Sequence, residues 1–540
     1  MRHVDAVVVG AGFGGLYSLY KLRGQGLSVQ LFERGSDVGG TWFWNRYPGA
    51  RCDVQSVYYS YSFDKELEQE WEWSEKYATQ PEILKYLSHV ADRFDLRPSI
   101  ALNSSVVSAE YDAGTATWTV TTDAGEQVRS KYLVMATGAL SAGRLPDIEG
   151  LDSFNGETYH TGSWPQSTVN FTGKRVGVLG TGSSGIQAIP LIAREAEQLT
   201  VFQRTPSFSL PAHNEPLDPG WVRQVKATYA ELREQSRLSP AGQPLRMPTQ
   251  SALEVPADDR NRRYEEAWQE GGPTIQTSFM DLMISPEANE TAAAFVRAKI
   301  DELVQDPATA ERLKPKEFPL GSKRVCVDSD YYITFNRENV TLKDVKSDPI
   351  VRITPAGVRT QNEEIELDVL VFATGFDALT GSLDRIHITG KDGATLKDTW
   401  AAGPRTYLGL SVAGFPNMFI VAGPGSPSVL TNMVMSIEQH VEWISDHVEH
   451  LEASGLVSEA NPAAQDEWVE HVNQAAAPTL FMKGNSWYLG ANVPGKPRVF
   501  MPYVGGHGDY RAKCDDVAAK DYEGFDFRPA PAVDASRVPA

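Results

Sequence analysis

One local pattern occurs twice in this chain of 540 residues, and it restricts the possible folds more than any other feature. Each copy is a short apolar run, a turn with three spaced glycines and a helix-compatible segment, with the turns at residues 10–15 and 180–185. The first glycine permits a tight bend, the second lets a pyrophosphate approach the backbone, and the third lets the helix pack on the strand. One such turn is weak evidence, but both copies have the required context. The sequence therefore predicts two dinucleotide sites, with candidate contacts Gly10, Gly12, Gly15, Gly180, Thr181, Gly182, Ser183, Ser184 and Gly185.

The residue at the end of the next strand distinguishes the two nucleotides. Glu33 lies 18 residues after Gly15, where a carboxylate can accept hydrogen bonds from a ribose but would repel a 2′-phosphate. This position favours FAD or NAD. Arg204 lies 19 residues after Gly185 and is followed by Thr205, and its guanidinium matches phosphate oxygens, which favours NADP. Each residue alone is also compatible with a solvated strand end, but the opposite charges at matching offsets favour two different nucleotides.

Short apolar runs at residues 4–9, 28–32, 132–136, 175–179, 199–202 and 369–372 are typical of buried parallel strands. They predict an α/β fold with two Rossmann-like domains, one for FAD (1–140 and 377–540) and one for NADP (141–213 and 321–376) inserted within it. Helical spacing of Val222, Val225, Tyr229 and Leu232, and a helix start at Ser285, predict a helical insertion over 214–320. Residues 528–540 are rich in Pro and Ala, and we expect a disordered tail there.

Composition excludes several classes of function. Lys and Arg total 50 and Asp and Glu total 70, a net charge of −20, which disfavours a nucleic-acid or anionic-membrane surface. Cys52, Cys326 and Cys514 are far apart, so we expect no disulfide framework, no disulfide-reductase dithiol and no Cys-rich metal site. No run of 18 apolar residues and no signal peptide is found, and we expect a cytoplasmic protein without bound metal.

Two longer motifs resemble those of one enzyme family. Residues 154–165 follow the pattern FxGxxxHxxxWP, and residues 39–53 contain Gly-Gly-Thr-Trp, then Tyr-Pro-Gly and a final Asp. Together they resemble the signature of the type I Baeyer–Villiger monooxygenases, and the resemblance extends over nearly the whole chain, through residues 321–324, 402–409 and 486–492. One departure is Gln166, where the signature commonly closes with Asp or Lys; we expect a local loop difference.

The resemblance implies an enzyme in which NADPH reduces FAD and O2 adds to the flavin C4a atom. The peroxyflavin then inserts one oxygen atom beside the carbonyl of an aryl, linear or cyclic ketone, giving an ester or lactone. The Trp164-Pro165 ending favours ketones over the heteroatom substrates of related flavin-containing monooxygenases, although sulfide oxidation is also expected. A nucleotide-binding regulatory flavoprotein without oxygenation is an alternative from another class. We expect a monomer or a weak homo-oligomer.

By motif match, Arg324 and Asp53 are the candidate catalytic residues. A guanidinium keeps its proton, so Arg324 can stabilise anions without protonating them, and Asp53 would orient it. The resemblance assigns Lys323 to the 2′-phosphate and Trp487 to the nicotinamide region; the plainer alternatives are a solvated basic pair and a buried anchor. The further FAD contacts that it implies are Gly40, Thr41, Trp42, Asp53, Tyr59, Val106 and Met433.

Two other residues are assigned less directly. His160 lies in the long motif, between the two predicted domains, and has no carboxylate near it in the sequence. Such a histidine is more often a structural or hinge residue than a proton shuttle. Val429 falls in the run that resembles the substrate-pocket loop of the family, and we expect it to narrow or reshape that pocket.

Overall fold

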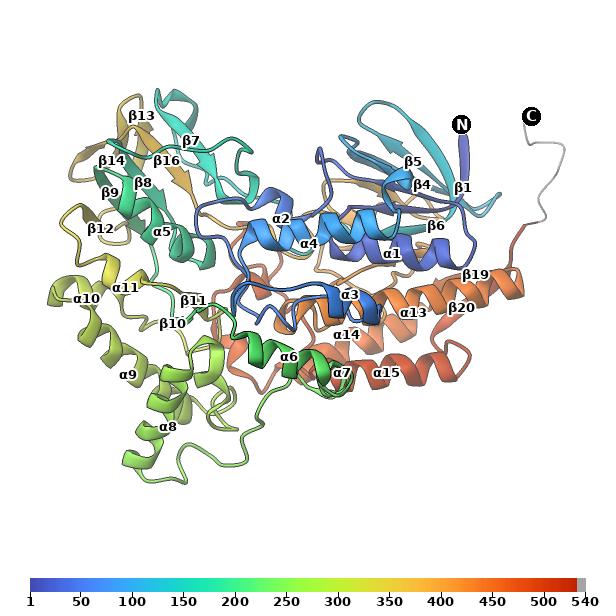
Figure 1. The fold of residues 1–540 in the computed structure, drawn as a ribbon. Helices are drawn as coiled ribbons and strands as arrows, with labels where there is room; N and C mark the ends of the chain where they lie inside the picture. The colour runs from blue at the N-terminus through green and yellow to red at the C-terminus, as the bar shows by residue number, and fades with distance from the viewer. Residues whose placement is uncertain (532–540) are drawn as a thin grey trace.

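The two predicted glycine turns lie in two separate sheets of the computed structural model, which describes residues 1–531. Figure 1 shows the sheets side by side, with most of the helices beneath them. The first sheet contains β1 (Arg2–Val9), β2 (Val29–Phe32), β3 (Ile100–Ala101), β4 (Val106–Asp112), β5 (Thr117–Thr122), β6 (Gln127–Met135), β17 (His387–Thr389) and β18 (Met418–Ile420). The second contains β7 (Glu157–His160), β8 (Arg175–Leu179), β9 (Gln198–Gln203), β12 (Val340–Asp344) and β16 (Val369–Phe372).

The order of the strands confirms the predicted α/β fold and the insertion of one unit in the other. In the first sheet the order is β17-β4-β5-β6-β1-β2-β3, with β18 also paired to β6; β1 is parallel to β2 and β6. The second sheet is parallel throughout, in the order β12-β9-β8-β16-β7. Since every strand of the second sheet falls between β6 and β17 in sequence, the second sheet is inserted within the first.

The remaining strands form smaller, separate sheets of two or three strands. They are β10 (Ser209–Pro211) with β11 (Cys326–Asp328), β13 (Ile350–Thr354) with β14 (Gly357–Thr360) and β15 (Glu364–Glu366), and β19 (Leu456–Ala460) with β20 (Phe525–Pro529). The β10–β11 pair is parallel, whereas the β13–β15 and β19–β20 pairings are antiparallel.

Helices cover both sheets, and the helix after each glycine turn is buried against its own sheet. Leu16 and Leu19 of α1 pack with Val8 and Leu31, and Ile186 and Ile189 of α5 pack with strands of the second sheet. The helices around the first sheet are α1 (Phe13–Gly24), α2 (Thr41–Trp44), α3 (Lys65–Glu70), α4 (Gln80–Arg93), α12 (Leu396–Thr399), α13 (Met433–Ser454), α14 (Pro462–Ala476) and α15 (His507–Ala519). Those that follow β8 and β11 are α5 (Ser183–Glu195) and α11 (Tyr331–Thr334).

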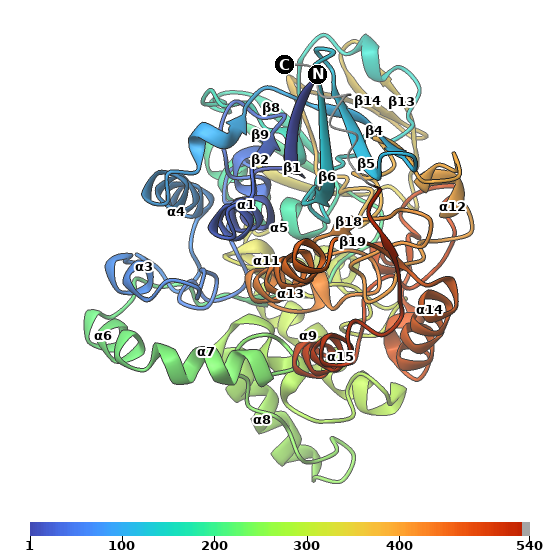
Figure 2. The same cartoon turned by 90° about the vertical axis from the view of Figure 1, so that its right-hand side faces the viewer.

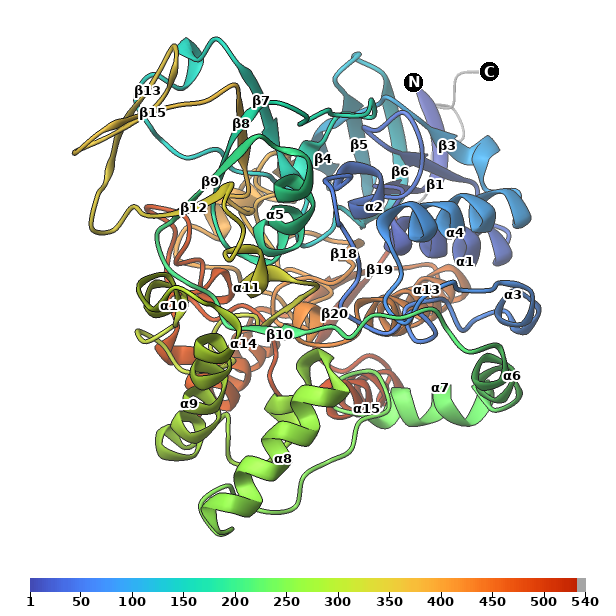
Figure 3. The ribbon, with the colours of Figure 1, turned by 60° about the vertical axis from the view of Figure 1, so that its left-hand side comes forward.

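The predicted helical insertion divides into two parts that pack against different neighbours. It contains α6 (Pro219–Ala227), α7 (Tyr229–Leu238), α8 (Ala257–Glu270), α9 (Pro286–Leu303) and α10 (Pro307–Leu313). Helix α7 contacts α15, which Figure 2 shows end-on beside it, and its buried Arg233 forms an ion pair of 2.7 Å with Glu68 of α3. Helices α8 and α9 share a separate apolar core with Phe208 and Phe318, and form the lower lobe seen in Figure 3.

Two local predictions need correction. The periodic stretch around residues 222–232 is two helices, because Thr228 ends α6 and Tyr229 starts α7. The disordered tail predicted from residue 528 is wrong at its start, because Arg528 and Pro529 end strand β20 by pairing with β19; residues 532–540 lie outside the described part of the chain. The first sheet also contains antiparallel pairs, since β5 is antiparallel to both β4 and β6. The Ser285 helix start is confirmed: its side chain accepts from Ala288 N at the start of α9.

Candidate active site

One cavity of about 1190 Å³ is lined by both glycine turns and by strand ends of both sheets. This exceeds the roughly 300–1,000 Å³ of a pocket for one drug-sized ligand. The structure brings together in its walls the predicted residues Gly10, Gly12, Glu33, Gly40, Thr41, Trp42, Asp53, Tyr59, Val106, Gly180, Thr181, Gly182, Ser183, Ser184, Arg204, Thr205, Lys323, Arg324, Met433 and Trp487. Gly15 and Gly185 do not line it.

The glycines of the two turns differ in the way the sequence predicted. Gly10 and Gly180 have φ of +102° and +108°, and a side chain at either would strike the carbonyl of the neighbouring strand end. At Gly15 a Cβ would come within 1.6 Å of Gly10 O, so this glycine serves the packing of α1 on the turn. A Cβ at Gly182 would meet nothing within 4 Å, because this backbone faces the open cavity. The second turn therefore leaves room for a ligand next to its backbone.

The carboxylate of Glu33 is held in place by the first turn. Its two oxygens accept hydrogen bonds from Ala11 N and Gly35 N, both at 2.7 Å, and the side chain is buried. A carboxylate fixed by backbone donors can accept a ribose hydroxyl on its remaining lone pairs. The geometry fits the predicted role at an adenosine ribose.

Arg204 and Lys323 form a cationic end of the cavity. The pKa of Lys323 is lowered, first by burial and then by the nearby charge of Arg204. The ammonium lies 4.1 Å from the centre of the Phe318 ring, a favourable cation–π distance. Two cations that repel each other in this way would be stabilised by a bound dianion, and this favours a phosphate between them.

Arg324 and Asp53 come from distant parts of the chain and meet in the cavity wall. The Nε and Nη2 atoms of Arg324 both donate to Asp53 Oδ2, at 3.0 and 2.5 Å, and Nη1 donates to Val429 O at 3.3 Å. The carboxylate raises the pKa of Arg324 further above its usual value. About 34% of the Arg324 side chain remains exposed, so the cation is oriented and still accessible to a ligand.

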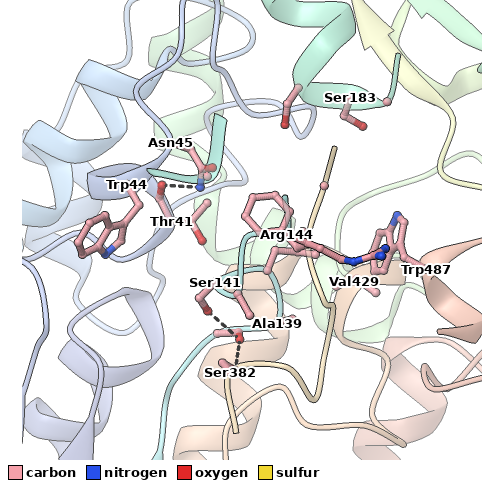
Figure 4. A pocket seen from close by; sticks show the side chains of 18 of the residues that line it. Thr41, Trp44, Asn45, Ala139, Ser141, Arg144, Ser183, Ser382, Val429 and Trp487 are labelled. Atoms are coloured by element: carbon pink, nitrogen blue, oxygen red, sulfur yellow. Dashed lines mark hydrogen bonds between the residues drawn. The ribbon is translucent and has the colours of Figure 1, made fainter. Parts of the chain in front are cut away.

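The other predicted contacts surround this ion pair. Trp487 is in the short 3-10 helix η7 (Trp487–Leu489), and Met433 is the first residue of α13. Figure 4 shows Trp487, Val429 and Arg144 on one side of the cavity, with Thr41 and Asn45 on the other and Ser183 above. Val429 is buried in the 3-10 helix η5 (Ser428–Leu430) and touches Arg324 through its carbonyl.

The two long sequence motifs pack against each other at the junction of the sheets. Trp164 N donates to Trp44 O at 3.1 Å, and the Trp164 ring shares a core with Tyr47 and the residues of α5. The Tyr47 hydroxyl donates to the Gln187 side chain of α5 at 2.8 Å. The residues that carried the family resemblance thus join the two nucleotide-binding units.

His160 binds backbone on both sides of its ring. Its Nδ1 accepts from Gly162 N at 3.0 Å, and Nε2 donates to Arg144 O at 3.3 Å. Burial lowers its pKa, so the neutral imidazole is favoured. The ring also lies where the two chain segments that connect the sheets meet. Gly143 of one segment forms a β-bridge with Phe376 of the other, and the Phe376 ring packs edge-on against His160. These contacts favour the structural role over a proton shuttle.

Sequence reasoning missed four further cations in the cavity wall, Arg34, Arg51, Arg144 and Arg385. Arg51 pairs with Glu75 at 3.0 Å. Within residues 1–531, Arg34, Arg144 and Arg385 donate to the backbone carbonyls of Ser141, Asn492 and Gly143 respectively, and none of the three donates to a carboxylate. Arg34 also lies 4.3 Å from the Trp44 ring. Arg34 directly follows Glu33 at the strand end, and this position was a signal that could have identified it.

Two features are absent from residues 1–531, a metal-binding cluster of side chains and a membrane-spanning helix. Among residues 1–531, no group of three His, Cys, Asp or Glu side chains could hold a metal ion. In the same part of the chain, no helix is both long and apolar enough to cross a membrane. Cys52, Cys326 and Cys514 are buried and carry free thiols.

Comparisons with known proteins agree with this site. The flavin-binding monooxygenase-like family model matches residues 3–220. A Baeyer–Villiger monooxygenase of Pseudooceanicola batsensis is 45% identical over 523 residues, 96% of this chain and 95% of that protein. The phenazine N-monooxygenase PhzNO1 of Lysobacter antibioticus is 42% identical over 97% of both chains. The solved structure of an oxidised steroid monooxygenase bound to NADP is 53% identical, with a TM-score of 0.93 over 97% of this chain and 99% of that one. The chain therefore belongs to the flavin-dependent Baeyer–Villiger monooxygenase family.

Proposed function

We propose that this protein is an FAD- and NADPH-dependent monooxygenase that inserts one oxygen atom of O2 beside a ketone carbonyl, giving an ester or a lactone. Water is the second product, and NADPH supplies the two electrons. The observation that carries the proposal is the Arg324–Asp53 ion pair in the wall of a cavity that both glycine turns share. The substrate is a small aryl, linear or cyclic ketone.

The residues present fit both cofactors. FAD would lie along the first turn, with its ribose at Glu33, its pyrophosphate at Gly12 and its remaining contacts at Gly40, Thr41, Trp42, Asp53, Tyr59, Val106 and Met433. NADPH would lie along the second turn, with its 2′-phosphate between Arg204 and Lys323 and its nicotinamide towards Trp487. The open backbone at Gly182 supports this arrangement, as do Arg204 and Lys323, which have no ion pair with a carboxylate within residues 1–531 of a chain of net charge −20. The two sheets support the corresponding division into an FAD-binding domain (1–140, 377–540) and an NADP-binding domain (141–213, 321–376) with a helical insertion (214–320).

Bound FAD supplies the activated oxygen, and the chain's own residues control charge around it. Arg324 keeps its proton, because the Asp53 carboxylate raises its pKa. It can therefore stabilise negative charge on the oxygen donor and on the tetrahedral adduct without protonating either. The side chain that reaches into the cavity is held by Asp53 and by Val429 O, so little reorganisation is needed during the reaction.

The experiment that tests the proposal uses purified protein with FAD, NADPH and a panel of ketones that includes phenylacetone and cyclohexanone. We expect anaerobic NADPH to bleach the flavin absorbance, and aerobic turnover to give esters or lactones. If NADPH does not reduce the flavin, the regulatory flavoprotein is favoured instead. Absence of an oxygenated product across the whole panel would contradict the proposal.

A second activity, oxygenation of nitrogen or sulfur, is favoured by one observation. The relative PhzNO1 is named a phenazine N-monooxygenase although it is 42% identical to this chain. We propose that sulfides are oxidised to sulfoxides as a side activity. Thioanisole and a phenazine in the same panel, compared with ketones at equal concentration, would rank the two activities.

We further propose that the protein works in the cytoplasm as a monomer or weak homo-oligomer. The three buried free cysteines support a reducing compartment. Light scattering at several concentrations tests the oligomeric state.

A further inference from the structure

Arg204 and Lys323, at the cationic end of the cavity, lie just before strands β10 and β11. A hydrogen bond between a buried serine and a buried aspartate, both outside the cavity, joins these two strands. Ser209 is the first residue of β10, and Asp328 is the last residue of its parallel partner β11. The Ser209 hydroxyl donates to Asp328 Oδ2 at 2.5 Å, and Tyr331 N donates to Oδ1 at 2.9 Å. Both side chains are buried, at 0% and 7% exposure, and neither lines the cavity. We call this pair the Ser209–Asp328 clasp.

A carboxylate is costly to bury, and Asp328 has no ion pair within residues 1–531 that would offset the cost. Burial raises its pKa to about 6, so the carboxylate is still ionised at neutral pH and accepts from both donors. The same strand pair is fixed by backbone bonds on both sides, since Cys326 N donates to Phe208 O and Ala212 N to Asp328 O. The clasp therefore locks the register of the strands where the chain leaves for α6–α10 and returns.

The contacts lead from this clasp to the two cations. Arg204 precedes Phe208 by four residues, and Phe208 is bonded to Ser209. The Phe208 ring packs edge-on against Phe318 with centroids 5.7 Å apart, and Phe318 lies under the Lys323 ammonium at 4.1 Å. Lys323 in turn precedes β11 by only three residues. A shift of β10 against β11 would thus change the separation of Arg204 and Lys323.

We propose that Ser209 and Asp328 are positioning residues for the 2′-phosphate of NADPH: by fixing β10 on β11 they set the spacing of Arg204 and Lys323, and with it the preference for NADPH over NADH. The inference rests on the proposed function, because it assumes that these two cations receive the 2′-phosphate. It predicts an effect on selectivity, since Arg204 and Lys323 lie at the end of the cavity that NADH, which lacks the 2′-phosphate, leaves empty.

The test measures dissociation constants of NADP⁺ and NAD⁺ for the FAD-loaded enzyme, by titration of the flavin absorbance. Ser209→Ala and Asp328→Asn are expected to lower the preference for NADP⁺ over NAD⁺ by at least about threefold, with the NAD⁺ dissociation constant nearly unchanged. A threefold change corresponds to part of the free energy of one charged hydrogen bond. Ser251→Ala is the matched control. That serine makes the same kind of bond to a buried aspartate, Asp281, within the lobe of α8 and α9, and its loss should leave the preference unchanged.

A double-mutant cycle tests the route of the effect. In an Arg204→Ala background, Ser209→Ala should change the NADP⁺ constant by less than about twofold, because the spacing no longer matters. Equal weakening of NADP⁺ and NAD⁺, or an unchanged preference in both clasp variants, would overturn the inference. If wild type makes esters with NADPH and prefers NADP⁺ while the clasp variants keep this preference, the positioning role of the clasp is refuted. The proposed function then still stands. A wild-type enzyme that binds both nucleotides equally would contradict the cofactor assignment, and the clasp with it.

Discussion

At the scale of single residues, Arg324 is the group whose loss should separate the two halves of the reaction. Arg324→Ala removes the cation that stabilises negative charge during oxygen transfer, but it leaves both glycine turns intact. We expect flavin reduction by NADPH to survive in stopped-flow measurements, and ester formation to fall by about 100-fold or more. Arg194→Ala is a suitable control, because Arg194 is an exposed arginine paired with Asp330. An unchanged product yield in Arg324→Ala would contradict the assigned role.

Two glycines of the second turn should respond oppositely to the same substitution. A Cβ at Gly185 would lie 2.3 Å from Gly180 O, so Gly185→Ala should destabilise the fold by about 1–3 kcal/mol. A Cβ at Gly182 points into open cavity, so Gly182→Ala should keep its melting temperature and lose about tenfold in NADP⁺ affinity. Thermal unfolding and NADP⁺ titration of both variants check this. A stable Gly185→Ala, or a Gly182→Ala with normal affinity, would argue against the turn geometry.

At the scale of elements, helix α7 should depend on one buried ion pair. The Arg233 and Glu68 side chains are only 3% and 7% exposed, and Arg233 also donates to Ser60 Oγ and to the carbonyls of Tyr58 and Tyr61. Arg233→Ala leaves a buried carboxylate and several acceptors without a partner, and should cost about 3–5 kcal/mol of unfolding free energy. Exposed Arg194→Ala should cost at most about 1 kcal/mol in the same denaturant titration. Similar losses in the two variants would refute the structural weight given to Arg233.

The sequence predicted elements better than it predicted which elements touch. Strands β8 and β16 begin and end at the predicted residues, because each is a short apolar run that starts next to a charged residue and ends just before a glycine turn. The amphipathic pattern around Val225 and Tyr229 indicated a buried helical face, but nothing in that pattern indicated that the partner of α7 would be α15. Only the fold brings those helices together, as it does Ser209 and Asp328.

The same limit applied to the candidate site. Arg324 and Asp53 were paired from a family resemblance, and the structure brings them into contact. Arg144 and Arg385 were not identified, because a cation in a cavity differs from a solvated one only in its surroundings. Gly15 was correctly given a packing role, since the strand and helix context already required close approach.

At the scale of the whole molecule, buried neutral histidines should make the fold sensitive to acid. Burial lowers the pKa of His447 from 6.5 to about 3, so the native state stays unprotonated while the unfolded chain binds a proton below pH 6.5. This contribution to stability is complete above pH 6.5 and is lost progressively as the pH falls towards 3. Glu438 and Asp328, whose pKa values burial raises to about 7 and about 6, act in the opposite sense over part of this range.

A single variant isolates the histidine contribution. His447→Gln can keep a hydrogen bond to Ser458 Oγ, which His447 contacts at 2.9 Å, and it does not titrate. Between pH 6 and 4 the unfolding free energy of this variant should fall less steeply than that of wild type, by up to about 1.4 kcal/mol per pH unit. Denaturant titrations at several pH values check this, and parallel slopes would contradict a buried neutral His447.

The central claim is that two nucleotide sites and one oriented arginine serve to insert an oxygen atom from O2 into a ketone. The most direct measurement is turnover of cyclohexanone or phenylacetone by the FAD-loaded enzyme with NADPH under ¹⁸O2, followed by mass spectrometry of the product. We expect a lactone or ester with one ¹⁸O atom, formed in proportion to the NADPH consumed. An unlabelled product, or NADPH oxidation that yields only hydrogen peroxide with every ketone, would contradict it.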